Sequence, residues 1–137
     1  MILTARKTNA EVIDEILGKL IEQGGQCIAN GECVYGNNDM HCAVGWLLPP
    51  DNEAVMTLLG GVYDLLNSFS GRLGPNEGFV KNNATLLVNL QNFHDADCVD
   101  FLNTAHKDLP PYAHKLTNVI AWKKLRTRQL EEHNNAI

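Results

Sequence analysis

Apolar residues recur every three or four positions along most of this chain, an interval that places them on one face of a helix. The pattern is clearest between Thr8 and Gly25, where Glu11 follows Thr8 at the spacing of a capping box. Gly24 and Gly25 end the pattern, because glycine adopts the left-handed conformation found at helix C-termini. We therefore predict a first helix here, with a buried face formed by Val12, Ile13, Ile16, Leu17, Leu20 and Ile21.

Two further helical patterns lie on either side of Pro49 and Pro50. The first is a short apolar stretch over 41–48, which ends at the prolines because the residue before a proline avoids helical geometry. Asp51 is a suitable N-cap for the second, which runs to Phe69 with two adjacent glycines at 60 and 61. Because glycine destabilises a helix interior, this stretch is either one kinked helix or two short ones.

A glycine-rich loop over 70–78 separates these patterns from three predicted helices over about 82–95, 96–109 and 111–133. Pro110 and Pro111 break the last two apart, and Pro111 suits the first turn of the final helix. The residues expected to pack inward from the last two helices are Val99, Phe101, Leu102, Ala105, Tyr112, Leu116, Val119, Ile120, Trp122 and Leu130.

Only one region has the composition of β-structure. The turn sequences ANGE and YGNND flank the short β-prone run ECVY, and QCIA is a possible pairing partner for it. A two-stranded hairpin is marginal alone and must pack on helices. The sequence therefore predicts a mainly α fold: a single compact domain over 1–137, with five or six helices and at most one small β-hairpin, at about 26–36.

Charge is distributed unevenly along the chain. The 137 residues carry a net charge of -5 and are 45% hydrophobic, as expected for one globular domain. Residues 1–109 hold 6 basic and 14 acidic residues, whereas Lys115, Lys123, Lys124, Arg126 and Arg128 lie between 110 and 130 with no acidic residue among them. This basic helix is interpreted either as a solvated face that compensates the helix dipole or as a contact surface for an acidic partner.

Several classes of location and function lack their usual signatures. No stretch has the form of a signal peptide or a membrane-spanning segment, so we expect a cytoplasmic protein with reduced cysteines. Phosphate-binding loops, dinucleotide fingerprints and serine nucleophile elbows are absent, and no cofactor is expected. The acidic body argues against nucleic acid as a partner.

The stretch CVYGNNDMHCAVGWLLPPD raises the question of a zinc site. Its possible ligands are Cys27, Cys33, His41 and Cys42. Cys27 and Cys33 are separated more widely than the two to four residues of a zinc knuckle, so we favour buried structural cysteines over a metal. A second alternative is that Cys42 is a nucleophile activated by a distant histidine, His94 or His106.

The stretch HDADCVD supplies another possible metal site. His94, Asp95 and Asp97 have the side chains of a small metal-dependent hydrolase, which is the alternative function for this chain. The simpler interpretation is that His94 closes one helix and that Asp95 or Asp97 caps the next.

Two blocks of this sequence resemble a group of small uncharacterised proteins that are common in bacteriophages and prophages. The first block has a Cys-x-Tyr run, then Cys-Ala-Val-Gly and a following Pro-Asp; the second has Leu-Gln-x-x-His-Asp. The resemblance covers about 32–97 and implies a phage-encoded accessory protein, but no activity. The motif residues are Cys33, Tyr35, Cys42, Gly45, Gln91, His94 and Asp95, and we expect the two blocks to pack together, with Gln91 or His94 bonded to a hairpin carbonyl.

Without a strong catalytic signature, the leading hypothesis is a non-catalytic protein that binds a protein of a bacterial host and inhibits or modulates it. Its candidate contact surfaces are the basic last helix, the turn at 37–40 and the loop at 71–78. The residues expected to contact the partner are Lys123, Lys124, Arg126, Arg128, Asn37, Asn38 and Arg72.

Overall fold

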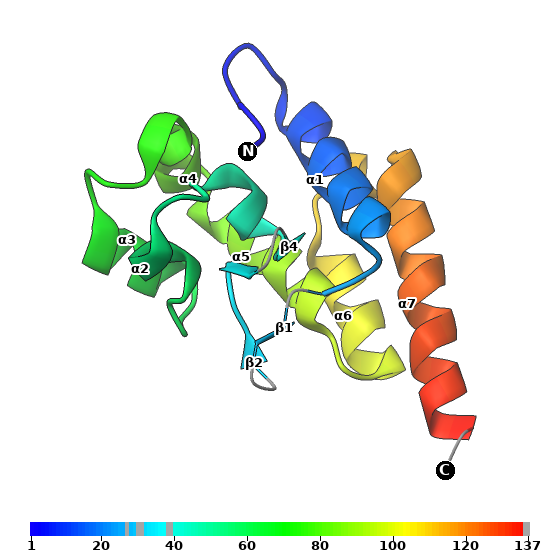
Figure 1. Cartoon of the computed structure of the whole chain (residues 1–137). Helices are drawn as coiled ribbons and strands as arrows, with labels where there is room; N and C mark the ends of the chain where they lie inside the picture. Colours follow the sequence, from blue (N-terminus) through cyan, green and yellow to red (C-terminus); the bar gives the residue numbers. More distant parts are fainter. Residues whose placement is uncertain (27, 30–31, 38–39, 136–137) are drawn as a thin grey trace.

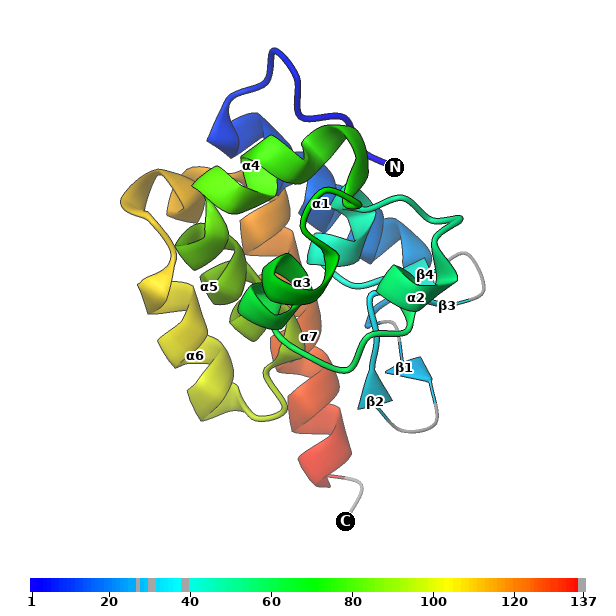
Figure 2. The same ribbon diagram turned by 90° about the vertical axis from the view of Figure 1, so that its left-hand side faces the viewer.

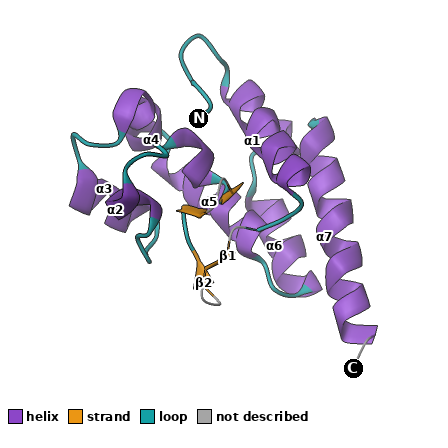
Figure 3. Ribbon diagram, viewed as in Figure 1, coloured by secondary structure: helices purple, strands orange, loops and turns teal. Residues whose placement is uncertain are grey.

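Helices form most of the computed structural model, which describes residues 1–26, 28–29, 32–37 and 40–135 (Figures 1 and 3). The mainly α prediction is confirmed. Within the described residues the α-helices are α1 (Asn9–Gln23), α2 (Glu53–Met56), α3 (Val62–Phe69), α4 (Glu77–Asn82), α5 (Ala84–Asp95), α6 (Val99–Asp108) and α7 (Thr117–Asn135). The 3₁₀ helices are η1 (Val44–Leu47), η2 (Gly74–Asn76) and η3 (Pro111–Lys115).

Helix α1 forms where the apolar pattern predicts it. The Thr8 side chain accepts a hydrogen bond from the Glu11 backbone N–H at 3.1 Å, and the Glu11 carboxylate accepts one from the Thr8 N–H at 3.1 Å. Gly24 ends the helix with φ 92°, and its N–H bonds back to the Ile21 carbonyl. Both ends of α1 are therefore fixed by local contacts.

The segments next to prolines and glycines depart from the predicted helix bounds. Of the stretch expected to be helical over 41–48, only Val44–Leu47 is helical, as the 3₁₀ helix η1, and His41 belongs to a strand. The side chain of Asn52, rather than of Asp51, caps α2, accepting from the Val55 N–H at 3.2 Å. The Gly60–Gly61 pair lies between α2 and α3, so two short helices form instead of one kinked helix. The expected loop at 70–78 contains η2 and the first turn of α4.

The β-structure consists of two short antiparallel ladders. Strands β1 (Ile28–Ala29) and β2 (Glu32–Cys33) pair as expected for the hairpin at 26–36. A second ladder, between β3 (Gly36–Asn37) and β4 (Met40–His41), goes beyond the single hairpin that we expected. In this ladder Gly36 pairs with His41, and Asn37 pairs with Met40.

The helices pack around one hydrophobic core. Helix α1 lies beside α7, and α6 contacts both α5 and α7, whereas α3 and α4 pack on the opposite side of α5 (Figures 1 and 2). Trp122 of α7 and Phe93 of α5 are fully buried at the centre. None of the helices in the described part of the chain is both long enough and apolar enough to cross a membrane.

Three residues expected in the core are exposed. Phe101, Tyr112 and Ile120 keep 64%, 41% and 42% of their surface accessible, so the predictions of inward packing were wrong for them. Tyr112 belongs to η3, whose three-residue turns rotate it away from the apolar face of α7. Ile120 lies next to Val119 on α7, and only Val119 points to the core.

The N-terminal segment is fixed to the core by a buried amide. Asn76 of η2 is 2% exposed, and its Nδ2 donates to the Ile2 and Leu47 carbonyls. Its Oδ1 accepts from the Thr4 N–H at 2.9 Å. Because these bonds join η2, η1 and residues 2–4, one side chain connects three segments distant in sequence.

Candidate functional site

A basic groove runs along one face of α7. Its α7 residues are spaced three and four apart, which aligns them in one stripe, and η3 and the C-terminal half of α6 close one end. The groove has a volume of about 540 Å³. We define the basic groove by its lining residues: His106, His114, Ile120, Lys123, Lys124, Thr127, Arg128 and Glu131.

Two histidines and a lysine form the closed end of the basic groove. The His106 and His114 rings stack with centroids 4.3 Å apart, and Lys123 Nζ lies 3.5 Å from His106 Nδ1. Burial, together with the charges of Lys123 and His114, lowers the pKa of His106 below its ordinary value. His106 is therefore held neutral to a lower pH than a free histidine, and an anion bound nearby would favour its protonation.

The two ends of the basic groove differ in chemistry. Ile120 contributes an apolar surface that is 42% exposed, and Lys124 and Arg128 are exposed one and two turns further along α7. Glu131 is the only carboxylate in the described lining, and it lies at the far end. From Ile120 to Glu131 the stripe extends roughly 16 Å at the helical rise of 1.5 Å per residue. Such a surface suits a carboxylate-rich segment with an apolar side chain near Ile120.

The structure separates Arg126 from the other predicted basic residues. Its Nη2 donates to the Ala96 carbonyl at 3.1 Å, and its Nη1 donates to Gln129 Oε1 at 2.8 Å. Arg126 therefore connects α7 to the turn after α5, and it does not line the basic groove. Charge alone marked Arg126 in the sequence, whereas its position on the helix turns it inward.

The other predicted contact residues lie apart from the basic groove. Asn37 is exposed on β3 and lines a separate shallow pocket beside α2. Arg72 is exposed, with its guanidinium 5.9 Å from the Phe69 ring centre. Asn38 lies outside the described residues. The three expected surfaces do not join into one site.

The two motif blocks meet, as predicted. Gln91 of α5 accepts a hydrogen bond from the Val44 N–H of η1 at 3.2 Å, and η1 packs on α5. We expected the side chain of Gln91 or His94 to bond to a hairpin carbonyl. Instead, the Gln91 side chain accepts a hydrogen bond from a backbone N–H. At His94 the backbone carbonyl is the acceptor, and Gln26 Nε2 donates to it at 2.9 Å. We use the name block joint for this contact between η1 and α5 together with the contact that η1 makes with Tyr35.

Glycine is required at the block joint. A Cβ atom at Gly45 would overlap the Tyr35 carbonyl oxygen, which accepts the Cys42 N–H at 3.2 Å. Cys42 is buried, and its sulfur accepts the Gly45 N–H at 3.3 Å. Tyr35, Cys42 and Gly45 therefore form one close-packed backbone contact, which explains these motif residues by architecture.

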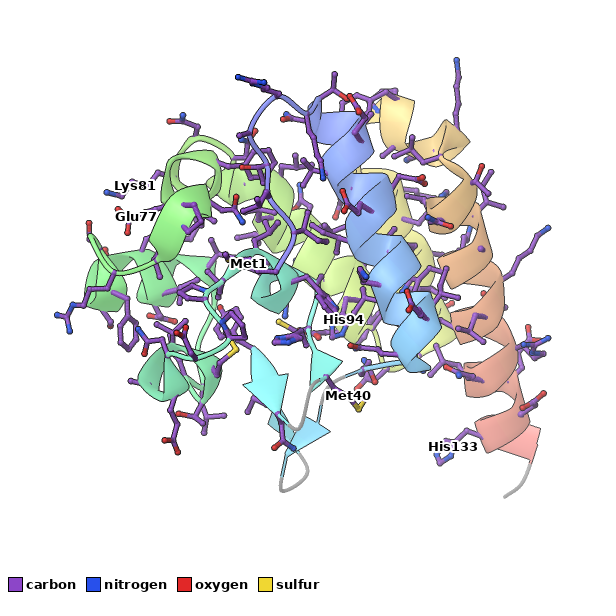
Figure 4. All side chains as sticks on the ribbon, turned by 45° about the horizontal axis from the view of Figure 1, so that its top comes forward. Met1, Met40, Glu77, Lys81, His94 and His133 are labelled. Carbon is purple, nitrogen blue, oxygen red and sulfur yellow. The ribbon has the colours of Figure 1, made fainter. Side chains whose placement is uncertain are left out.

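His94 is an interior residue. It is fully buried, its ring stacks parallel to Trp122 at 5.9 Å, and its Nδ1 lies 2.5 Å from Asp95 Oδ1. Figure 4 shows His94 among the packed interior side chains, whereas His133 projects from the end of α7. His94 therefore joins α5 to α7 and is not presented to a substrate at the surface.

The structure tests one of the two metal sites considered from the sequence and leaves the other untested. His94, Asp95 and Asp97 are all described, and no three His, Cys, Asp or Glu residues of the described chain are grouped to hold a metal ion. Asp97 is exposed while His94 is fully buried, so this set does not converge. In the zinc set, Cys27 and the Cys33 side chain lie outside the described structure, so that set stays a sequence hypothesis with His41 and Cys42.

The stacked histidines were missed in the sequence analysis. His106 and His114 belong to different elements, and Pro110 and Pro111 separate them, so no helical spacing relates them. The available signal was their flanking of the double proline, which turns η3 back beside α6.

Comparison with known proteins returns no relative: no family model, no curated protein and no solved structure matches this chain.

Proposed function

We propose that this protein acts by binding another protein, and that the basic groove on α7 is its contact surface. The observation that carries the proposal is that Lys123, Lys124 and Arg128 line one groove around the half-exposed Ile120. A cationic stripe with an apolar residue at one end is the complement of an acidic segment that carries an apolar anchor.

The charge contrast within the molecule supports this choice of surface. The net charge is -5, so a basic groove on an otherwise acidic protein orients an approaching acidic partner toward α7. Association through such a surface is expected to weaken as ionic strength rises, because exposed charges are screened over about 8 Å at 0.15 M salt.

The resemblance of the two blocks to phage and prophage proteins suggests the setting. We infer a phage-encoded accessory protein that occupies a bacterial host protein in the cytoplasm and inhibits or modulates it without catalysis. No observation on the described chain favours the hydrolase alternative, since its three proposed ligands do not converge.

The experiment is affinity capture from a bacterial lysate, read by mass spectrometry, with the wild type and a groove variant carrying Lys124→Glu and Arg128→Glu. Both residues are exposed, so the variant is expected to fold. We expect one protein to be recovered near stoichiometry with the wild type and to be reduced at least tenfold with the groove variant.

The matched control reverses two exposed cations outside the basic groove, Arg6→Glu and Arg72→Glu. It changes the net charge equally, so partner recovery should be retained. If the partner is lost only with the control variant, the interface lies at the loop around Arg72 and not at the basic groove. Recovery unchanged in the groove variant would contradict the proposal.

A further inference from the structure

A second pocket lies at the block joint, away from the basic groove. Tyr35 comes from the first motif block and Asp95 from the second, and the Gly60–Gly61 turn before α3 closes one side. Its volume is about 220 Å³. We call it the joint pocket, and its lining residues are Val34, Tyr35, Cys42, Leu58, Gly60, Gly61, Val62, Val88, Gln91, Asn92 and Asp95.

The joint pocket combines an apolar wall with oxygen acceptors. Leu58 and Val88, which are half-buried, supply aliphatic surface. The Tyr35 hydroxyl donates to the Gly60 carbonyl at 2.9 Å, which leaves the lone pairs of the phenol oxygen available to a ligand. Asp95 directs Oδ1 to His94, its side chain is 38% exposed, and it lines the pocket, so it supplies the carboxylate of the joint pocket.

The charge of the joint pocket has one sign. Among the described residues that line it there is one carboxylate, Asp95, and no lysine, arginine or histidine. Burial is the largest cause that raises the pKa of Tyr35, and the carboxylates of Asp95 and Asp64 raise it further. Negative charge is therefore felt at the phenol oxygen itself, where a cation would be stabilised.

We propose that the joint pocket binds a small organic cation, with an ammonium or amidinium group on Asp95 and Tyr35 and a compact apolar body against Leu58 and Val88. A cavity of about 150 Å³ holds benzene, so a volume of about 220 Å³ admits a ring with a one- or two-atom cationic substituent. The charge-assisted hydrogen bond to Asp95 selects the cation, and the aliphatic wall selects its apolar body.

The test compares three probes of the same shape: benzylamine, benzyl alcohol and benzoate. Each is titrated into the full chain labelled with ¹⁵N, and the amide shifts of Tyr35, Gly60, Gly61 and Asn92 report occupancy. We expect benzylamine to bind about ten times more tightly than benzyl alcohol, as a charge-assisted bond implies, and benzoate not to bind. Equal affinity for the three probes, or shifts confined to other residues, would overturn the proposal.

Two variants locate the cation. Asp95→Asn removes the charge but keeps the shape, and should lower benzylamine affinity to that of benzyl alcohol. Asp97→Asn removes an exposed carboxylate two residues away that does not line the joint pocket, and should leave benzylamine binding unchanged. Equal loss in both variants would show a diffuse charge effect and contradict the assignment.

Asp95 also contacts His94, so a loss of binding in Asp95→Asn can come from a destabilised fold. A third variant therefore blocks the joint pocket without changing Asp95. Asn92 is exposed at the rim, so Asn92→Trp should narrow the joint pocket and abolish binding of both benzylamine and benzyl alcohol at an unchanged melting temperature. Retained binding in this variant would contradict the proposed position. The groove variant, Lys124→Glu with Arg128→Glu, should bind benzylamine normally, so this test is independent of the proposed function.

Discussion

The basic groove and the block joint differ in what their residues are used for. In the groove, Lys124 and Arg128 are exposed, and their side chains contribute little to holding the fold together. At the block joint, Gly45 and Gln91 make contacts that allow two distant segments to pack. The chemically richest sequence, with its cysteines, histidine and aromatic residues, builds architecture, whereas a plain excess of lysine and arginine marks the candidate interface.

The largest expected effect comes from adding one methyl group at the block joint. Gly45→Ala forces a Cβ atom onto the Tyr35 carbonyl, where backbone must move, so we expect a loss of about 3 kcal/mol in the free energy of unfolding or failure to fold. Urea denaturation measures it. Gly78→Ala is the control: nothing lies within 4 Å of its added Cβ, and alanine favours the helix, so stability should stay equal or rise. Equal losses in the two variants would contradict the close contact at Gly45.

Removing the hydrogen bond of the block joint should have the next largest effect. Gln91→Leu leaves the Val44 N–H without its acceptor, which costs about 1–3 kcal/mol of unfolding free energy. Gln91→Glu keeps an oxygen acceptor and should recover part of the loss. Asn92→Ala, at an exposed neighbouring position, should change stability by less than about 0.5 kcal/mol. A Gln91→Leu protein as stable as the wild type would show that the Gln91 hydrogen bond does not stabilise the block joint.

A smaller effect is expected from pH at the closed end of the basic groove. Because the pKa of His106 is lowered in the folded state, the unfolded chain takes up a proton first as pH falls below the ordinary histidine range. His106 therefore contributes no penalty at neutral pH and a slight destabilisation at acidic pH. NMR titration of the imidazole should show His106 titrating at a lower pH than histidine in an unstructured peptide.

The cause of the lowered pKa can be separated in the same titration. Lys123→Met removes one of the two charges but leaves the burial, so the pKa of His106 should rise partway toward its ordinary value. An unchanged titration in Lys123→Met would mean that Lys123 does not face the His106 ring.

The smallest effect on stability is expected in the centre of the basic groove. Lys124→Glu with Arg128→Glu should change the free energy of unfolding by no more than about 0.5 kcal/mol, because both side chains are exposed. The melting temperature measures it. A large loss would mean that these cations hold the fold together, and the contrast between the groove and the joint would fail.

Local sequence predicted what local contacts determine. The capping box of Thr8 and Glu11 and the left-handed Gly24 fix α1 without help from the rest of the chain. Gln91 and the η1 segment were expected to meet, because both blocks carry apolar residues that need a partner. The predictions were wrong where tertiary packing decides which way a side chain points. Arg126, expected at the surface, bonds to the Ala96 carbonyl, and Ile120, expected in the core, is exposed beside the basic groove.

The basic groove itself was only partly predictable. Its lysines and Arg128 follow from helical spacing, but the stacking of His106 on His114 depends on how η3 folds back after the double proline. The joint pocket was not predicted at all, because its walls come from the residues between β2 and β3, the turn before α3, and α5. Pockets of this kind are made by the meeting of segments, which no single stretch of sequence encodes.

The most direct test of the account is affinity capture from a bacterial lysate with the wild type, the groove variant and Gln91→Leu, with recovery normalised to folded protein. The account predicts that the groove variant loses the partner while keeping wild-type stability, and that Gln91→Leu retains the partner per folded molecule while losing stability. A groove variant that still recovers the partner, with Gln91→Leu failing when folded, would place the interface at the block joint and contradict the central claim.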